Sequence, residues 1–145
     1  MYKHILLPTD GSALSKSAMR ACISLASETG ARITALYVIP AFRVFHHETP
    51  MLAASKNDFV KDARQHAQQY LAEIEAAAQD AGVRCDTLAV DGERPHEVII
   101  KTAREHDCDL IAMASHGRRG AKAAMLGSET QKVLAYSHLP VLVYR

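Results

Sequence analysis

Short apolar runs alternate along this chain with longer segments in which apolar residues recur every three or four positions. The runs cover residues 4–7, 33–39, 83–90, 110–113 and 140–144, and the segments between them cover residues 14–26, 59–78, 95–103 and 128–137. Short apolar runs predict buried strands, and the helical spacing predicts amphipathic helices. Strands that alternate with helices pair in parallel through right-handed crossovers. The order therefore predicts an α/β fold, a three-layer sandwich with five parallel strands and four helices.

Residues at the ends of these segments add detail to the predicted fold. Helix stops and starts are expected at Gly30, Gly82 and Pro95. The pattern Ser-x-x-Gln from Ser128 to Gln131 predicts a capping box at the start of the fourth helix. Residues 41–56 show no clean period and are expected to form a long loop. Because the run 83–90 is more polar than the others and 110–113 is wholly apolar, we expect the first nearer a sheet edge and the second inside the sheet.

The composition excludes several classes of function. The 17 basic and 16 acidic residues give a formal charge of +1, whereas a dedicated nucleic-acid binder usually carries a marked basic excess. The three cysteines form no Cys-x-x-Cys pair, which argues against a zinc site or a disulfide framework. No segment is apolar over the length that spans a bilayer, and the start of the chain lacks the apolar core of a signal peptide. We expect one domain over residues 1–145, located in the cytoplasm, with neither a nucleic acid nor a membrane as partner.

The stretch ASHGRRGAKAAMLGS, residues 114–128, follows the fourth predicted strand and is the most informative part of the sequence. Ligands of open parallel sheets bind beyond the carboxyl ends of the strands, where the strand order reverses. Gly117 can adopt a positive φ that lets successive amides converge on an anion, while Gly127 and Ser128 begin a helix whose free N–H groups attract phosphate. Alternatively, Gly117 belongs to a plain turn and Ser128 caps its own helix. The residues alone leave both interpretations open.

Two familiar phosphate-binding loops are absent. The chain contains no Walker A motif, and Pro8-Thr9-Asp10-Gly11 does not supply the dinucleotide fingerprint after the first strand. The spacing Ala114-x-x-Gly117, nine residues, Gly127-Ser128 instead resembles the loop Gly-x-x-Gly-x(9)-Gly-Ser/Thr of the universal stress protein family. LLPTDGS near the start, YVIP after the second strand and LPVLVYR at the end resemble the same family, so the likeness extends along essentially the whole chain.

The resemblance implies a Rossmann-like sheet of strand order 3-2-1-4-5 and a homodimer formed through the C-terminal strand. It also implies that an adenine nucleotide, ATP with Mg²⁺, lies across the carboxyl edge of the sheet. Pro8, Thr9 and Asp10 would line the adenine and ribose, and Val38 would contact the base through its backbone. Met113 and Ala114 would flank the ribose, and the phosphates would be held by Gly117, Gly127 and Ser128.

Two residues depart from what a triphosphate site favours. Ala114 stands where the family motif has its first glycine, and its methyl group is expected to weaken binding rather than abolish it. Glu129 would repel a triphosphate unless its carboxylate points away or shares a divalent cation, although a carboxylate in the first turn also suits the helix dipole.

We therefore expect a regulatory or sensing protein of the stress response, with at most slow ATP hydrolysis, because no nucleophile and general base can be paired by spacing. A dimeric interaction protein of the same family that binds no nucleotide remains the first alternative, and a slow ATP-hydrolysing enzyme the second. The protein partners are not predicted.

Overall fold

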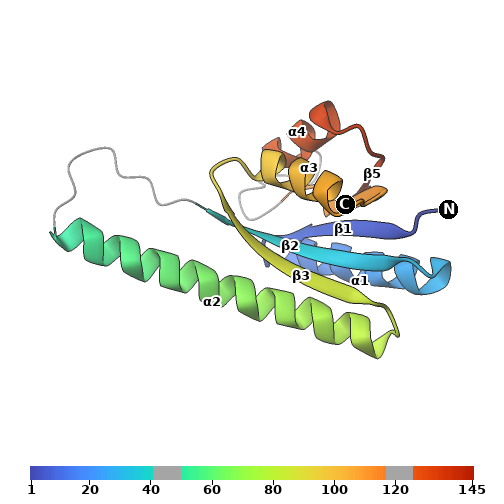
Figure 1. The fold of residues 1–145 in the computed structure, drawn as a ribbon, viewed down its shortest axis with the longest axis horizontal. Helices are drawn as coiled ribbons and strands as arrows, with labels where there is room; N and C mark the ends of the chain where they lie inside the picture. Colours follow the sequence, from blue (N-terminus) through green and yellow to red (C-terminus); the bar gives the residue numbers. More distant parts are fainter. Residues whose placement is uncertain (41–49, 117–125) are drawn as a thin grey trace.

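The computed structural model of the chain describes residues 1–40, 50–116 and 126–145, with the backbone alone described over 50–54. The elements in chain order are β1 (His4–Thr9), α1 (Ala13–Thr29), β2 (Arg32–Pro40), α2 (Pro50–Asp80), β3 (Cys85–Gly92), α3 (Pro95–Glu105), β4 (Leu110–Ala114), α4 (Ser128–Tyr136) and β5 (Val141–Tyr144). All strand pairs are parallel, and the sheet has the order β3-β2-β1-β4-β5 (Figure 1). The predicted α/β fold and its strand order are confirmed.

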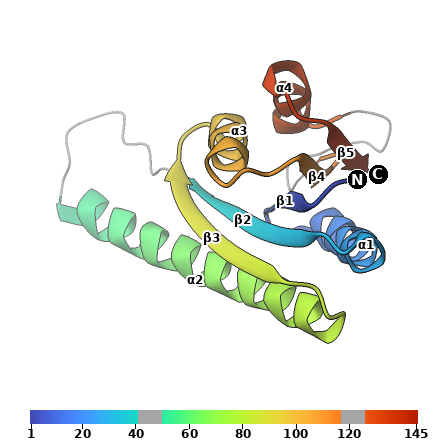
Figure 2. The ribbon, with the colours of Figure 1, turned by 45° about the vertical axis from the view of Figure 1, so that its right-hand side comes forward.

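The sheet lies between two layers of helices, α1 and α2 on one face and α3 and α4 on the other (Figure 2). Successive side chains of a strand point to opposite faces, so each strand contributes to both layers. Ile5 and Leu7 of β1 belong to the core under α1 and α2, whereas Leu6 and Met113 belong to the core under α3 and α4. Apolar residues fill both faces of the inner strands, which is why these strands read as continuous apolar runs.

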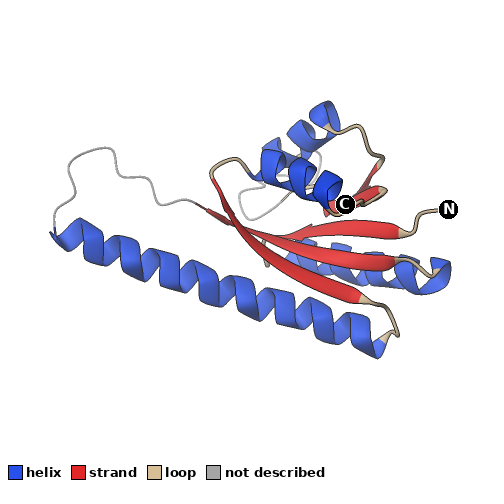
Figure 3. Cartoon of the chain, viewed as in Figure 1, coloured by secondary structure: helices blue, strands red, loops and turns tan. Residues whose placement is uncertain are grey.

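Capping residues set both ends of α1, and the stop at Gly30 is the one that the sequence predicts. The hydroxyl of Ser12 accepts a hydrogen bond from the amide of Ser15 at 3.2 Å, and Gly30 ends the helix with a φ of 74°. The strand order also places β3 at one edge and β4 between β1 and β5, as expected from their polarity. Because the strands are parallel, their carboxyl ends share one edge of the sheet (Figure 3). The loops that could hold a ligand begin at that edge.

Two predicted boundaries are wrong. Helix α2 already begins at Pro50, so the expected loop over 41–56 is shorter, and residues 41–49 lie outside the described residues. Proline suits a first helical position, and the first turns of α2 extend past the end of the sheet (Figure 1), so no apolar stripe marks them in the sequence. Strand β3 spans Cys85–Gly92 rather than 83–90, because the amide of Val83 still donates to Ala78 O at 2.8 Å and completes the end of α2.

Candidate functional site

Three neighbouring strands bring six of the predicted site residues to the carboxyl edge of the sheet, with Ala114 as the last residue of β4. The register Thr9↔Tyr37 between β1 and β2 places Val38 level with Asp10, one residue further along each strand. The register Leu6↔Ile111 between β1 and β4 places Met113 level with Pro8, two residues further along each strand. Val38 and Met113 pack in the core on the α3 and α4 face. Met113 is buried there, so its side chain is not exposed at this edge.

The turn after β1 is held by its own polar side chains. The Thr9 hydroxyl lies 2.5 Å from the Ser15 hydroxyl and accepts from the amide of Gly11 at 3.2 Å. Asp10 Oδ1 accepts from the amide of Ser12 at 2.9 Å, so this carboxylate stabilises the turn. Gly11 has a φ of 77°, and a side chain there would overlap the ring of Tyr70 from α2. The turn therefore presents a fixed backbone at the edge of the sheet.

The start of α4 is tied closely to the end of β4. The amide of Gly127 donates to Ser115 O at 2.7 Å, and the buried Thr130 hydroxyl donates to Ala114 O at 3.0 Å. A Cβ at Gly127 would lie 3.0 Å from the Cα of His116, so this close approach of the backbone favours glycine. These contacts fix the N-terminus of α4 beside the last residue of β4. Thr130 is a positioning residue that the sequence analysis missed.

The N-terminus of α4 differs from the predicted capping box. Gly127, not Ser128, is the N-cap, and no side chain of the described residues caps this end. The side chain of Gln131 donates to Leu126 O at 2.7 Å instead of reaching the N-cap amide. Ser128 is exposed at the first helical position, and its hydroxyl has no hydrogen-bond partner among the described residues. The alternative in which Ser128 only caps its own helix is therefore wrong, and the uncapped amides form an anion-attracting end.

Ala114 occupies the last position of β4 without backbone strain. Within the described ranges, Asp107 is the single non-glycine residue with a positive φ, so Ala114 does not require the left-handed conformation that favours glycine. The residue continues the β4–β5 ladder opposite Tyr144. The departure from the family motif thus concerns the space taken by one methyl group and not the backbone conformation.

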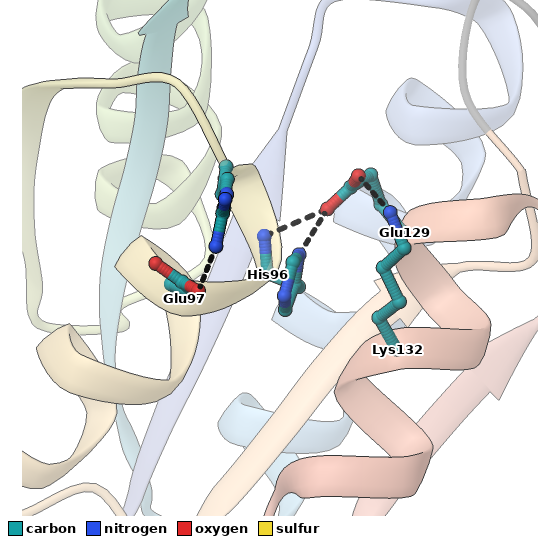
Figure 4. A network of polar contacts seen from close by, with 5 residues as sticks. His96, Glu97, Glu129 and Lys132 are labelled. Atoms are coloured by element: carbon teal, nitrogen blue, oxygen red, sulfur yellow. Dashed lines mark hydrogen bonds and ion pairs between the residues drawn. The ribbon is translucent and has the colours of Figure 1, made fainter.

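Glu129 points away from the N-terminus of its own helix, toward α3 (Figure 4). Its Oε2 accepts from the amide of His96 at 2.8 Å and from His96 Nδ1 at 3.0 Å, and Lys132 Nζ lies 3.5 Å from Oε1. Partial burial raises the pKa of this carboxyl, but the two His96 hydrogen bonds and Lys132 outweigh burial and leave the pKa below its usual value. Glu129 is therefore ionised, and its carboxylate is directed at the neighbouring helix α3. It points away from the N-terminus of α4, which is the first of the two conditions under which it would not repel a triphosphate.

Some predicted features lie outside the described residues. Gly117 falls in the segment 117–125, so its part in an anion nest stays a prediction. In the described part of the chain, no group of three or more His, Cys, Asp or Glu residues could hold a metal ion. None of the helices in the same residues is long and apolar enough to cross a membrane.

A Thr130→Val variant tests whether the start of α4 is fixed as described. Valine keeps the shape of threonine but leaves the Ala114 carbonyl without its hydrogen bond at 3.0 Å. We expect the free energy of unfolding, measured by urea denaturation, to fall by about 1–2 kcal/mol. A Thr130→Ser variant keeps the hydroxyl, so it is the control that can still donate to Ala114 O. Equal stability of Thr130→Val and the parent protein would show that this bond does not hold α4 in place.

Comparison with known proteins decides the family. The model of the universal stress protein family matches residues 1–145. The chain belongs to the universal stress protein family. Universal stress protein YxiE of Bacillus subtilis is 31% identical to it, and the alignment covers 100% of both chains. The structure of the universal stress protein UspA from Lactobacillus plantarum superposes with a TM-score of 0.86 at 25% identity and covers 99% of this chain and 98% of that one.

Several more distant structures of the family hold nucleotides. A universal stress protein family protein from Arabidopsis thaliana has AMP bound, and the protein from Archaeoglobus fulgidus is in complex with dAMP. Another universal stress protein is in complex with cAMP. They match this chain with TM-scores of 0.70, 0.68 and 0.72, at identities of 17%, 16% and 21%, and so share its fold.

Proposed function

We propose that this universal stress protein is a cytoplasmic sensor that binds an adenine nucleotide, ATP with Mg²⁺, at the carboxyl edge of its sheet. The observation that carries the proposal is the N-terminus of α4 at the end of β4, where no described side chain caps the amides that follow Gly127 and the Ser128 hydroxyl is exposed. Such a terminus attracts phosphate through its free N–H groups and its dipole. Nucleotide-bound structures with the same fold make adenine nucleotides the ligand class to test first.

Each end of the nucleotide would meet a different part of this edge. In the proposal, the base lies against Pro8 and Thr9 and contacts the backbone of Val38, and the ribose lies by Asp10, Met113 and Ala114. Gly127, Ser128 and Gly117 hold the phosphates. Mg²⁺ would arrive with the nucleotide and neutralise phosphate charge, since no ready-made cage of protein ligands occurs in the described ranges.

The proposed functional unit is a homodimer of the single domain 1–145, joined through β5. This strand is at the edge of the sheet, and Leu142 on it is 36% exposed. An apolar hollow beside β5 is lined by Met1, Tyr2 and Leu142. Edge strands carry unpaired backbone groups that a second copy can pair. A nucleotide that binds one dimer arrangement more tightly would shift the population toward it, and protein partners of the stress response would read that shift.

Isothermal titration calorimetry with ATP, with and without Mg²⁺, tests the nucleotide proposal. We expect saturable heat with one nucleotide per chain. Absence of both heat and co-purifying nucleotide would contradict the proposal and favour the alternative, an interaction protein that binds no nucleotide. If the protein releases inorganic phosphate from ATP faster than a variant in which a bulky side chain blocks the N-terminus of α4, the result would instead favour slow hydrolysis.

An Ala114→Gly variant tests the departure from the family motif. Since Ala114 needs no unusual φ, glycine removes only a methyl group at the end of β4. We expect ATP affinity to be held or to increase by up to about fivefold, the range that loss of one poorly placed methyl group allows. Calorimetry on both proteins measures the change. Weaker binding by the glycine variant would show that Ala114 makes a favourable contact and that its role is wrongly assigned.

A further inference from the structure

We propose that His96 is a positioning residue that keeps the Glu129 carboxylate away from the phosphate-binding end of α4. The inference rests on the proposed nucleotide site and adds a specific requirement to it. Helices α3 and α4 both begin at the carboxyl edge of the sheet and pack against each other. His96 is the second residue of α3 and Glu129 the second residue of α4, so each lies at the positive end of its helix.

The contact has the form of a fixed interhelix pair. Glu129 Oε2 receives both the amide of His96 and His96 Nδ1, at 2.8 and 3.0 Å. A carboxylate oxygen only accepts, so Nδ1 carries the hydrogen of this bond. The His96 ring is buried and packs against Tyr136 of α4 with a centroid distance of 6.1 Å. The Glu129 carboxylate therefore interacts with the positive N-terminus of α3 and not with the N-terminus of α4, its own helix.

The need for such a contact follows from the position of Glu129. A glutamate in the first turn of a helix is attracted by the uncapped amides of that helix. At α4 these are the amides that would hold phosphate, beside Gly127 and Ser128. A carboxylate returned to them would compete with the nucleotide and repel its charge. The other charged groups here do not replace His96, because Lys132 reaches only Oε1 at 3.5 Å and Arg94 pairs with Glu97 at 3.2 Å.

His96→Asp and His96→Asn form a matched pair of variants for this inference. The two side chains have the same shape, and both remove the imidazole ring. Asparagine can still donate from a position near that of Nδ1, whereas aspartate supplies its own anion to α3 and expels the Glu129 carboxylate. We expect His96→Asp to bind ATP about tenfold more weakly than His96→Asn, the size of effect that a carboxylate a few ångströms from a polyanion produces. Calorimetry with ATP is the readout, and circular dichroism confirms that both variants are folded.

The double variant His96→Asp/Glu129→Gln separates positioning from a general effect on the structure. If the expelled carboxylate is the cause, its neutralisation restores at least half of the lost binding free energy, while Glu129→Gln alone binds ATP at least as tightly as the parent protein. Equal ATP affinity of His96→Asp and His96→Asn, or no recovery in the double variant, would overturn the inference with the nucleotide site intact. Absence of ATP binding by the parent protein would overturn the proposed function itself, and the role of His96 with it.

Discussion

Ser128→Asp is expected to lower ATP affinity about thirtyfold relative to Ser128→Asn, which corresponds to about 2 kcal/mol for a carboxylate placed against the phosphates. Ser128 is exposed at the first position of α4, and within the part of the chain that the structure describes no side chain caps this end of the helix. A carboxylate there is favourable for the helix dipole, so the fold is expected to be retained or slightly stabilised. The substitution thus opposes phosphate binding without opposing folding. Calorimetry with ATP gives the affinities, and urea denaturation gives the stabilities.

The asparagine variant is the matched control because it has the shape of aspartate and no charge. It removes the serine hydroxyl in the same way, so the difference between the variants reports charge alone. Similar ATP affinities for the two variants would mean that the phosphates lie elsewhere, and the assignment of Ser128 to the phosphate site would be abandoned.

Gly127→Ala is expected to lose both stability and ATP binding. The added Cβ would lie 3.0 Å from His116 Cα and 3.3 Å from Ser115 O, and backbone atoms cannot move aside without shifting the start of α4. Such overpacking costs about 1–3 kcal/mol in the free energy of unfolding. ATP affinity falls as well, because the amides of α4 leave the end of β4. Residues larger than alanine at this position are expected to abolish ATP binding and to lower the free energy of unfolding further.

Gly30→Ala provides the comparison for this variant. Gly30 has a φ of 74°, and a Cβ added there would meet no atom of the described residues within 4 Å, so alanine is opposed by backbone conformation alone. We expect Gly30→Ala to lose about 1 kcal/mol of stability and to bind ATP like the parent protein. If Gly127→Ala were as stable as the parent protein and bound ATP equally well, the tight contact between α4 and the end of β4 would have no functional importance.

The architecture could be predicted because its determinants are local and repeated. Apolar runs such as 110–113 identify buried strands, and glycine at Gly30 ends α1 with the left-handed conformation that its position requires. Strand order itself did not follow from the residues but from the resemblance to a family, since parallel pairing constrains topology without choosing one order. The β1 turn, the end of β2 and the loop after β4 then fall at one edge of the sheet.

The details that were missed depend on contacts between distant segments. Helix α2 begins at Pro50 without an apolar stripe, because its first turns extend past the sheet (Figure 1). His96 and Glu129 lie 33 residues apart, and nothing near either residue indicates that they meet. The capping box from Ser128 to Gln131 was a reasonable local prediction, but the contact of Gly127 with Ser115 places the N-cap one residue earlier. The tertiary contact between Gly127 and Ser115 therefore decides where α4 begins, and the local sequence pattern does not.

The central claim is that nucleotide phosphates bind at the N-terminus of α4. Titration of the ¹⁵N-labelled protein with ATP and Mg²⁺, followed by amide chemical shifts, tests it most directly. We expect the largest shift changes at the amides of Ser128, Glu129 and Thr130, with a second group at Thr9, Asp10 and Val38. Changes confined to another surface, such as the apolar hollow by Leu142, or no changes at saturating ATP, would contradict the account.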